Sequence, residues 1–201
     1  MKPYIVLLMG LVLNCGAHAA DLATDVRSRL AQPAVLRGEF EQAKQVRGFK
    51  KQLLSKGDFL VARERGVVWR TREPFASVLK LTPTEIVATQ GGDVAFRLSA
   101  STEPTVRVIN SLMFSLLNGD VTALGEQFTL SGSVDGKSWS LVLVPKQVAF
   151  SKILTRVGLS GDAYVRRMVM EEANGDKTVI SFHGQRPDPA KLSPEEAQRF
   201  D

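Results

Sequence analysis

Residues 57–69 read Gly-Asp-Phe-Leu-Val-Ala-Arg-Glu-Arg-Gly-Val-Val-Trp, and their pattern decides the fold class. The stretch contains two period-two segments, Gly57 to Ala62 and Val67 to Arg70, with a turn at Arg65-Gly66 between them. A period of two places successive side chains on opposite faces, which is typical of a β-strand. Two such segments joined by a short turn predict adjacent antiparallel strands.

Similar segments continue on both sides of this stretch. Together they predict ten or eleven short strands in an antiparallel meander, broken once in mid-chain. The other expected strands are Phe40 to Val46, Ser77 to Leu81, Glu85 to Thr89, Val94 to Leu98, Gln127 to Val134, Ser138 to Val144, Ile153 to Leu159, Tyr164 to Glu171 and Thr178 to His183. Asp135-Gly136 and Asn174-Gly175 predict two-residue hairpins in which both central residues have positive φ.

Three helices are expected beside the strands. Asp21 can cap a first helix whose apolar stripe ends before Pro33. A second helix, with a broad apolar face, occupies the interval between residues 103 and 119. Ser193-Pro194-Glu195-Glu196 is a capping-box sequence that opens a short third helix.

A sheet of ten or eleven antiparallel strands curls strongly, because each strand pair adds a right-handed twist. The first two helices have apolar faces that can lie across its concave side. We therefore predict a mainly β (α+β) fold, a curved antiparallel half-barrel with helices over the concave face. This arrangement leaves an apolar interior whose contents the sequence alone does not settle.

The N-terminus has the layout of a secretory signal peptide. Lys2 precedes an apolar run from Ile5 to Leu13, and Ala17-His18-Ala19 forms a small-x-small cleavage site. We expect cleavage after Ala19 and one mature domain over residues 20–201, in an extracytoplasmic space. Cys15, the one cysteine, lies in the removed segment, so no disulfide is expected. The alternative, a lipoprotein acylated at Cys15, is disfavoured by the preceding asparagine.

The charge balance is mildly basic. Lys2 is the one Lys, Arg, Asp or Glu among residues 1–19, so cleavage lowers the formal net charge from +5 to +4. Basic residues are spread along the chain without the interleaved aromatic residues of a nucleic-acid binder, and we expect no nucleic-acid partner. A solvated basic surface and loose attraction to anionic lipid headgroups both fit this distribution.

The sequence offers little for catalysis. After cleavage His183 is the one histidine, and no Gly-x-Ser-x-Gly elbow or phosphate-binding glycine loop occurs. One histidine without cysteine cannot form the usual zinc or transition-metal shell. The adjacent pairs Glu171-Glu172 and Glu195-Glu196 do not resemble carboxylates facing each other across a cleft. We expect no catalytic residues, no metal, no cofactor and no enzymatic activity.

The order of short motifs resembles the LolA-type periplasmic lipoprotein carriers. The motifs are Phe40-Glu41-Gln42, the glycine-opened strand from Gly57 to Arg63, Trp69 just beyond it, the mid-chain apolar helix and the strand from Leu141 to Lys146. Each motif is weak alone, but their order and spacing are fairly specific and cover nearly all of the mature chain.

The resemblance implies a half-open β-barrel with a helical lid over an apolar cavity that shields acyl chains from water. It implies a monomeric periplasmic carrier that moves a lipoprotein or other envelope lipid from an inner-membrane donor complex towards an outer-membrane acceptor. Arg63 matches the family arginine that holds the lid closed, with Arg65 the alternative if the register slips. The residues expected to line the cavity are Phe40, Phe59, Val67, Trp69, Leu112, Met113 and Leu116.

Several alternatives stay open. Arg63 could be an ordinary surface arginine, and Trp69 and the lid-helix residues could be ordinary packing. Family members carry a proline after the latch arginine, whereas this chain has Glu64-Arg65-Gly66, so the cargo could be a glycolipid or an aryl-polyene-like ester. A lipid-sensing or partner-binding half-barrel without transport is the second hypothesis. An enzyme acting on lipid esters or cell-wall material is the third.

Overall fold

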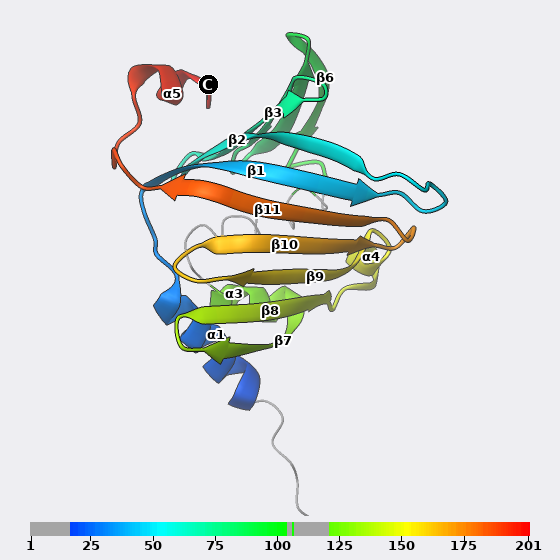
Figure 1. Cartoon of the computed structure of the whole chain (residues 1–201), viewed down its shortest axis with the longest axis vertical. Helices are drawn as coiled ribbons and strands as arrows, with labels where there is room; N and C mark the ends of the chain where they lie inside the picture. The colour runs from blue at the N-terminus through cyan, green and yellow to red at the C-terminus, as the bar shows by residue number, and fades with distance from the viewer. Residues whose placement is uncertain (1–16, 104–105, 107–120) are drawn as a thin grey trace, which may run out of the picture.

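The computed structural model describes residues 17–103, 106 and 121–201. Eleven strands form one curved antiparallel sheet in the order β6-β5-β4-β3-β2-β1-β11-β10-β9-β8-β7 (Figure 1). The strands are β1 Val35–Gln45, β2 Leu53–Ala62, β3 Gly66–Glu73, β4 Ser77–Leu81, β5 Glu85–Gln90, β6 Asp93–Ser99, β7 Phe128–Asp135, β8 Ser138–Pro145, β9 Leu154–Gly161, β10 Val165–Glu172 and β11 Lys177–Arg186. The predicted mainly β half-barrel is confirmed.

The sheet consists of two meanders joined by a seam. Strands β1 to β6 follow one another in space as in sequence, and so do β7 to β11. The seam is the antiparallel pairing of β1 with β11, in which Phe40 lies opposite Phe182. Strands β6 and β7 are the two edges of the sheet, because the order begins and ends with them.

Four helices are described: α1 Ala17–Arg29, α3 Val121–Gln127, α4 Val148–Ser151 and α5 Pro194–Gln198. The first helix lies where it was predicted, but Asp21 is inside it and is not its N-cap. The third predicted helix is confirmed as α5, because Ser193 and Glu196 form the capping box with Pro194 in the first turn. Helices α3 and α4 were not expected from the sequence, and most of the predicted helix over 103–119 lies outside the described residues.

Side chains pack on both faces of the sheet. On the concave face, α1 and α3 pack against β7, β8 and β9 in a cluster that includes Val26, Leu124 and Leu141. A second concave cluster covers β1 to β5 and includes Phe40, Phe59 and Val67. The convex face of β1, β2 and β3 carries a smaller third cluster, which Leu192 and Phe200 cover from outside.

Both predicted hairpins are present, with turns other than the expected ones. Asp135 is paired with Ser138, so Gly136 and Lys137 form the two-residue loop. Only the glycine has positive φ, 56°, which matches a type II′ turn rather than type I′. At the other hairpin, Gly175 donates its backbone N–H to the Glu172 carbonyl at 3.0 Å and has φ 91°, the pattern of a three-residue loop closed by a left-handed glycine.

Within the described ranges, no helix has both the length and the apolar character needed to cross a lipid bilayer.

Candidate functional site

The concave face contains a cavity of about 350 Å³. It lies between the end of α1 and strands of both meanders, and all but a few of its lining side chains are apolar. The described residues that line it are Leu30, Ala31, Pro33, Leu36, Gln42, Phe59, Val61, Val67, Trp69, Leu79, Leu81, Ala163, Tyr164, Val165, Met168, Met170, Ile180, Phe182 and Gln185. A hollow of this size and character suits an apolar ligand.

An aromatic cluster forms one wall of the cavity. The Phe40 ring stacks on Trp69 with centroids 3.7 Å apart, and Phe59 lies 6.2 Å from the Trp69 centroid. Phe182 meets Phe59 edge-on at 5.6 Å and Trp69 edge-on at 6.0 Å. These rings come from β1, β2, β3 and β11, so the cluster spans the seam between the meanders.

Gly57 makes room for this wall. A Cβ atom there would lie 1.9 Å from the Arg70 carbonyl oxygen and 2.9 Å from the Phe40 ring. The first is a backbone atom of the neighbouring strand and cannot rotate away. The glycine at the middle of β2 therefore allows β3 to approach closely and the Phe40 ring to lie across the strand.

Three of the cavity residues predicted from sequence line the cavity: Phe59, Val67 and Trp69. Phe40 is not among the lining residues, because it is buried behind Trp69. The predicted lid-helix residues Leu112, Met113 and Leu116 lie outside the described residues.

The second meander contributes lining residues that were not predicted from the sequence. Met168 and Met170 of β10 face the cavity together with Ile180 and Phe182 of β11. Strand alternation carries this signal, since residues two apart on a half-buried strand share a face. The missing information was the β1–β11 seam, which brings the late strands beside the strands around Trp69.

Polar groups gather at the end of the cavity formed by the β9–β10 turn. Ala31 donates its backbone N–H to the Ala163 carbonyl at 2.8 Å, which fixes the segment after α1 to that turn. Gln185 donates from Nε2 to the Val165 carbonyl at 2.8 Å and accepts from Arg166 Nη1 at 2.5 Å. The Gln185 amide therefore has partners at both its oxygen and its nitrogen, which fixes its orientation at the cavity.

Arg63 follows directly after β2. Its backbone N–H donates to the Ala34 carbonyl at 3.0 Å, which extends the β1–β2 ladder by one residue. Strand alternation therefore places its side chain on the concave face with Phe59 and Val61. In the described part of the chain, its Nε and Nη2 atoms are buried and have no hydrogen-bond partner. A buried guanidinium without partners is costly, so this group is suited to bind acceptors.

Arg65 lies on the other side of the sheet. Its Nη1 donates to the Ala197 carbonyl at 2.7 Å, and its guanidinium lies 6.0 Å from the centroid of the Phe200 ring. Both partners belong to the C-terminal segment on the convex face. The structure therefore places Arg63, and not Arg65, towards the concave side.

A buried ion pair fixes that C-terminal segment to the sheet. Arg37 Nε and Nη2 donate to the two carboxylate oxygens of Glu196 at 2.6 Å each, and the side chains are only 9% and 16% exposed. Arg37 also donates to the carbonyls of Pro189 and Lys191. The hydrogen bonds from Arg37 lower the pKa of Glu196 to about 2. The convex face of β1 is thereby covered independently of the cavity.

No group of three or more His, Cys, Asp or Glu side chains placed to hold a metal ion occurs among the described residues. His183 is half-exposed on β11, with Nε2 3.9 Å from Glu41 Oε2. The chemistry that the described cavity offers is apolar contact.

No sequence among curated proteins matches the chain. A LolA superfamily protein from Nitrosomonas europaea is 11% identical with a TM-score of 0.48, over 88% of this chain and 95% of the other. A domain described as an outer membrane lipoprotein-sorting protein, from Vibrio parahaemolyticus, is 10% identical with a TM-score of 0.49, over 92% and 99%. A DUF1329 family protein from Desulfovibrio piger is 14% identical with a TM-score of 0.48, over 88% and 94%.

The family comparison covers most of the sequence. The profile described as "Outer membrane lipoprotein carrier protein LolA-like" matches residues 15–200. That range contains every strand of the sheet and every described residue that lines the cavity. This chain belongs to the LolA-like family of outer membrane lipoprotein carrier proteins.

Proposed function

We propose that the protein is a periplasmic carrier that binds the acyl chains of a lipoprotein or another envelope lipid and moves the lipid towards the outer membrane. One observation carries the proposal: a cavity of about 350 Å³ on the concave face, lined almost entirely by apolar side chains. A monomer would take its cargo from an inner-membrane donor and release it to an outer-membrane acceptor, without covalent chemistry.

The physical chemistry of acyl chains supports this role. Each methylene exposed to water costs about 0.8 kcal/mol, so a lipid that crosses an aqueous compartment needs an apolar cover. Met168 and Met170 supply flexible, polarizable side chains that can adapt to chains of different shape. The aromatic wall around Trp69 is rigid by comparison, because its four rings pack on one another. One wall fixes the position of the guest and the other adapts to it.

The central test is binding of a fluorescent fatty acid to protein stripped of lipid. Met168→Trp puts a larger side chain into the cavity, and we expect affinity at least about tenfold weaker because inserted volume displaces the guest. The matched control is Val169→Trp, one residue further along β10, whose side chain points to the opposite face. Equal affinity for the two variants would refute the cavity as the binding site.

Arg63 is proposed as the group that holds the closed state. Its buried guanidinium has unused donors within the described residues, and acceptors that meet those donors would stabilise closure by about 1 to 3 kcal/mol. We expect Arg63→Leu to bind the fluorescent fatty acid but to change its rate of transfer between donor and acceptor vesicles. Arg65→Leu, which alters only contacts on the convex face, is the matched control.

The same transfer assay separates a carrier from a lipid-sensing module. A carrier accelerates movement of the lipid from donor to acceptor vesicles in proportion to protein concentration. A protein that binds the fatty acid with no such acceleration, with or without the Arg63 substitution, is not a carrier.

A further inference from the structure

The hairpin between β1 and β2 projects from one end of the sheet (Figure 1). We call residues 46–54 the rim hairpin; they read Val-Arg-Gly-Phe-Lys-Lys-Gln-Leu-Leu. Phe49 is 68% exposed, Leu53 61% and Leu54 66%. Three large apolar side chains exposed close together are a feature of interaction surfaces rather than of an ordinary solvated loop.

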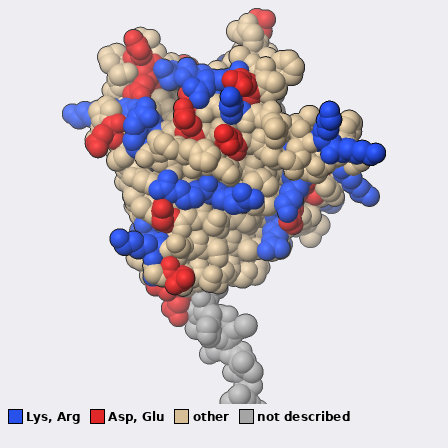
Figure 2. All heavy atoms as spheres, in the orientation of Figure 1, with Lys and Arg blue, Asp and Glu red and all other residues tan. Residues whose placement is uncertain are grey.

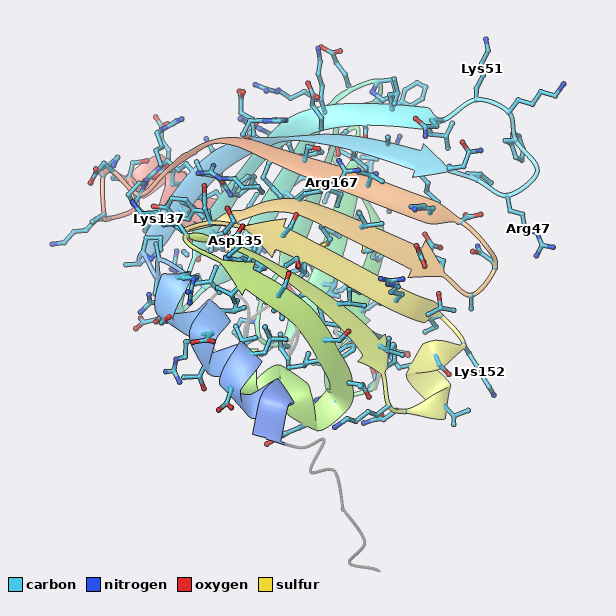
Figure 3. The ribbon with its side chains drawn as sticks, turned by 60° about the horizontal axis from the view of Figure 1, so that its bottom comes forward. Arg47, Lys51, Asp135, Lys137, Lys152 and Arg167 are labelled. Atoms are coloured by element: carbon cyan, nitrogen blue, oxygen red, sulfur yellow. The ribbon has the colours of Figure 1, made fainter. Side chains whose placement is uncertain are left out.

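Basic side chains accompany the apolar ones. Arg47, Lys50 and Lys51 lie in the rim hairpin, which contains no Asp or Glu. Figure 2 shows Lys and Arg side chains gathered where the rim hairpin projects, and Figure 3 shows Arg47 and Lys51 pointing away from the body of the protein. This tip therefore presents positive charge and apolar surface together.

The acidic groups of the neighbouring β10–β11 turn pair with the base of the hairpin rather than with its tip. Glu172 and Asp176 accept from Lys44 Nζ at 2.8 and 3.3 Å. Asp176 also accepts from the backbone N–H of Arg47 at 2.9 Å, and this hydrogen bond lowers the pKa of Asp176. The carboxylates at the β10–β11 turn thus fix the base of the hairpin. Among the described residues, the side chains of Arg47, Lys50 and Lys51 have no hydrogen bond or ion pair.

The tip has a defined backbone conformation. Phe49 donates its backbone N–H to the Val46 carbonyl at 3.0 Å and accepts at its own carbonyl from Gln45 Nε2 at 2.5 Å. Gly48 has a φ of 87°, which allows the tight turn. The backbone of Phe49 is therefore fixed within a hydrogen-bonded turn, and its side chain is exposed.

Other connections at the same end also expose apolar side chains. Phe75, between β3 and β4, is 72% exposed, and Val148, the first residue of α4, and Ile153, just after α4, are exposed as well. Lys152 lies beside Ile153 and is placed towards the same end of the molecule as Arg47 in Figure 3. Exposed apolar side chains at this end thus come from at least three separate connections.

We propose that this end of the protein docks on the surface of an anionic lipid bilayer. Phe49, Leu53 and Leu54 enter the interface, and Arg47, Lys50 and Lys51 bind the phosphate groups of the lipids. Apolar tips among long basic side chains suit a fluid anionic interface, where each Lys or Arg adds to binding and apolar groups insert at headgroup depth. The acid-free tip argues for this occupant by charge complementarity.

This inference goes beyond the proposed carrier function and does not depend on it. The cavity is lined at its far end by the segment after α1 and the β9–β10 turn, whereas the docking surface is formed by the rim hairpin and its neighbours. None of the residues from 46 to 54 lines the cavity. Variants of the rim hairpin therefore separate membrane docking from binding of a fatty acid.

The test is flotation of the purified protein with vesicles, after an intact-mass measurement has shown whether residues 1–19 are present. Vesicles of phosphatidylcholine mixed with phosphatidylglycerol are compared with phosphatidylcholine alone, at low and high salt. We expect binding only to the anionic vesicles, weakened by salt. Phe49→Ser and the double variant Lys50→Gln/Lys51→Gln should each bind about tenfold more weakly.

Two controls make the result specific. Lys137→Gln/Arg167→Gln removes the same charge from the opposite end and the convex sheet, as Figure 3 shows, and should bind like the wild type. Phe49→Trp should bind and should show a blue shift of its fluorescence on anionic vesicles.

The proposal is overturned if the wild type does not float with anionic vesicles, or if the Lys137→Gln/Arg167→Gln control loses as much binding as the rim-hairpin double variant. It is also overturned if Phe49→Ser abolishes self-association or capture of an acidic protein while vesicle binding is unchanged. The circular dichroism spectrum and the urea-unfolding midpoint of each variant, compared with those of the wild type, show whether it is folded.

Discussion

Gly57 is a residue of the 57–69 motif that is directly required for packing of the aromatic wall of the cavity. It lies opposite Phe40 in the β1–β2 ladder, and a side chain there would collide with the backbone of β3. The glycine that opens the motif at 57–69 is therefore a packing requirement of the aromatic wall. The sequence pattern predicts that a strand starts at this glycine, whereas β2 begins at Leu53. The close approach of Arg70 depends on the β2–β3 register, which the sequence does not show.

We predict that Gly57→Ala lowers the free energy of unfolding by about 2 to 3 kcal/mol, because the added methyl group overpacks a site bounded by backbone. Urea unfolding measures the loss. Gly158→Ala in β9 is the matched control, since its Cβ would meet Val169 at an ordinary 3.7 Å. That variant should be neutral or up to about 1 kcal/mol more stable. Similar losses in both variants would contradict the steric argument.

At the scale of elements, α5 shows what a sequence pattern can and cannot predict. The capping box at Ser193 was predicted and is present, because it is a local interaction among four consecutive residues. The same Glu196 carboxylate also binds Arg37, a residue far away in sequence. The local sequence pattern does not predict the ion pair between Glu196 and Arg37, since an arginine on a strand is normally solvated.

The ion pair gives a prediction with a defined pH dependence. Glu196→Gln keeps the shape of the side chain but leaves Arg37 without its buried counter-charge. We expect the free energy of unfolding at about pH 7 to fall by about 2 to 4 kcal/mol. The pKa of Glu196 is lowered in the folded state from 4.5 to about 2. The stability contributed by its charge is therefore fully present above the ordinary value and is lost as the pH falls towards about 2.

Urea unfolding of the wild type and Glu196→Gln, repeated from about pH 7 down to about pH 3, measures this difference. The two proteins should converge as the solution becomes more acidic. Glu85→Gln is the control, because the Glu85–Arg97 pair is just as short, 2.6 Å, but its Arg97 side chain is 57% exposed. We expect that control to lose under about 1 kcal/mol. A constant difference at every pH would rule out the ion pair as its source.

The helices show most clearly which elements a local sequence pattern does not predict. The predicted bounds of β4, and of β8 to β11, agree with the structure to within a few residues, because alternation and turn residues mark these strands. The helices α3 and α4 are short, seven and four residues, and too brief for helical periodicity to be visible. Their positions depend on packing: Leu124 and Phe150 are buried in the cluster around α1.

At the scale of the whole molecule, two concave clusters share one continuous sheet. Trp139 belongs to the cluster around α1 and donates from Nε1 to the Asp162 carbonyl at 2.6 Å. Trp69 belongs with the other cluster, around Phe40. The fold class was predictable, because strand count and twist dictate a curved sheet, whereas the apolar hollow was expected only from the family resemblance. The division into two clusters was not predictable, because it depends on where α1 and α3 pack.

The chain contains two tryptophans, one for each cluster, so its cooperativity can be measured directly. We predict that Trp69→Phe and Trp139→Phe each unfold in one transition, with the remaining tryptophan's fluorescence and the far-ultraviolet circular dichroism sharing a midpoint. The β1–β11 seam joins the two meanders through a long ladder, which favours unfolding as one unit. Separate midpoints within either variant would show that the two halves unfold independently.

The pairing of β1 with β11 also determines the order in which the strands of the sheet can pair during synthesis. As a nascent chain emerges, β1 can pair at once with β2, but its other edge waits for β11, which is synthesised almost last. Glu39 and Glu41 place exposed charge on β1 during that interval, a common protection against pairing with another chain. A chain truncated after β10 would leave this edge unpaired permanently, with only those two charges against pairing with another chain, and aggregation rather than a smaller soluble barrel is its expected fate.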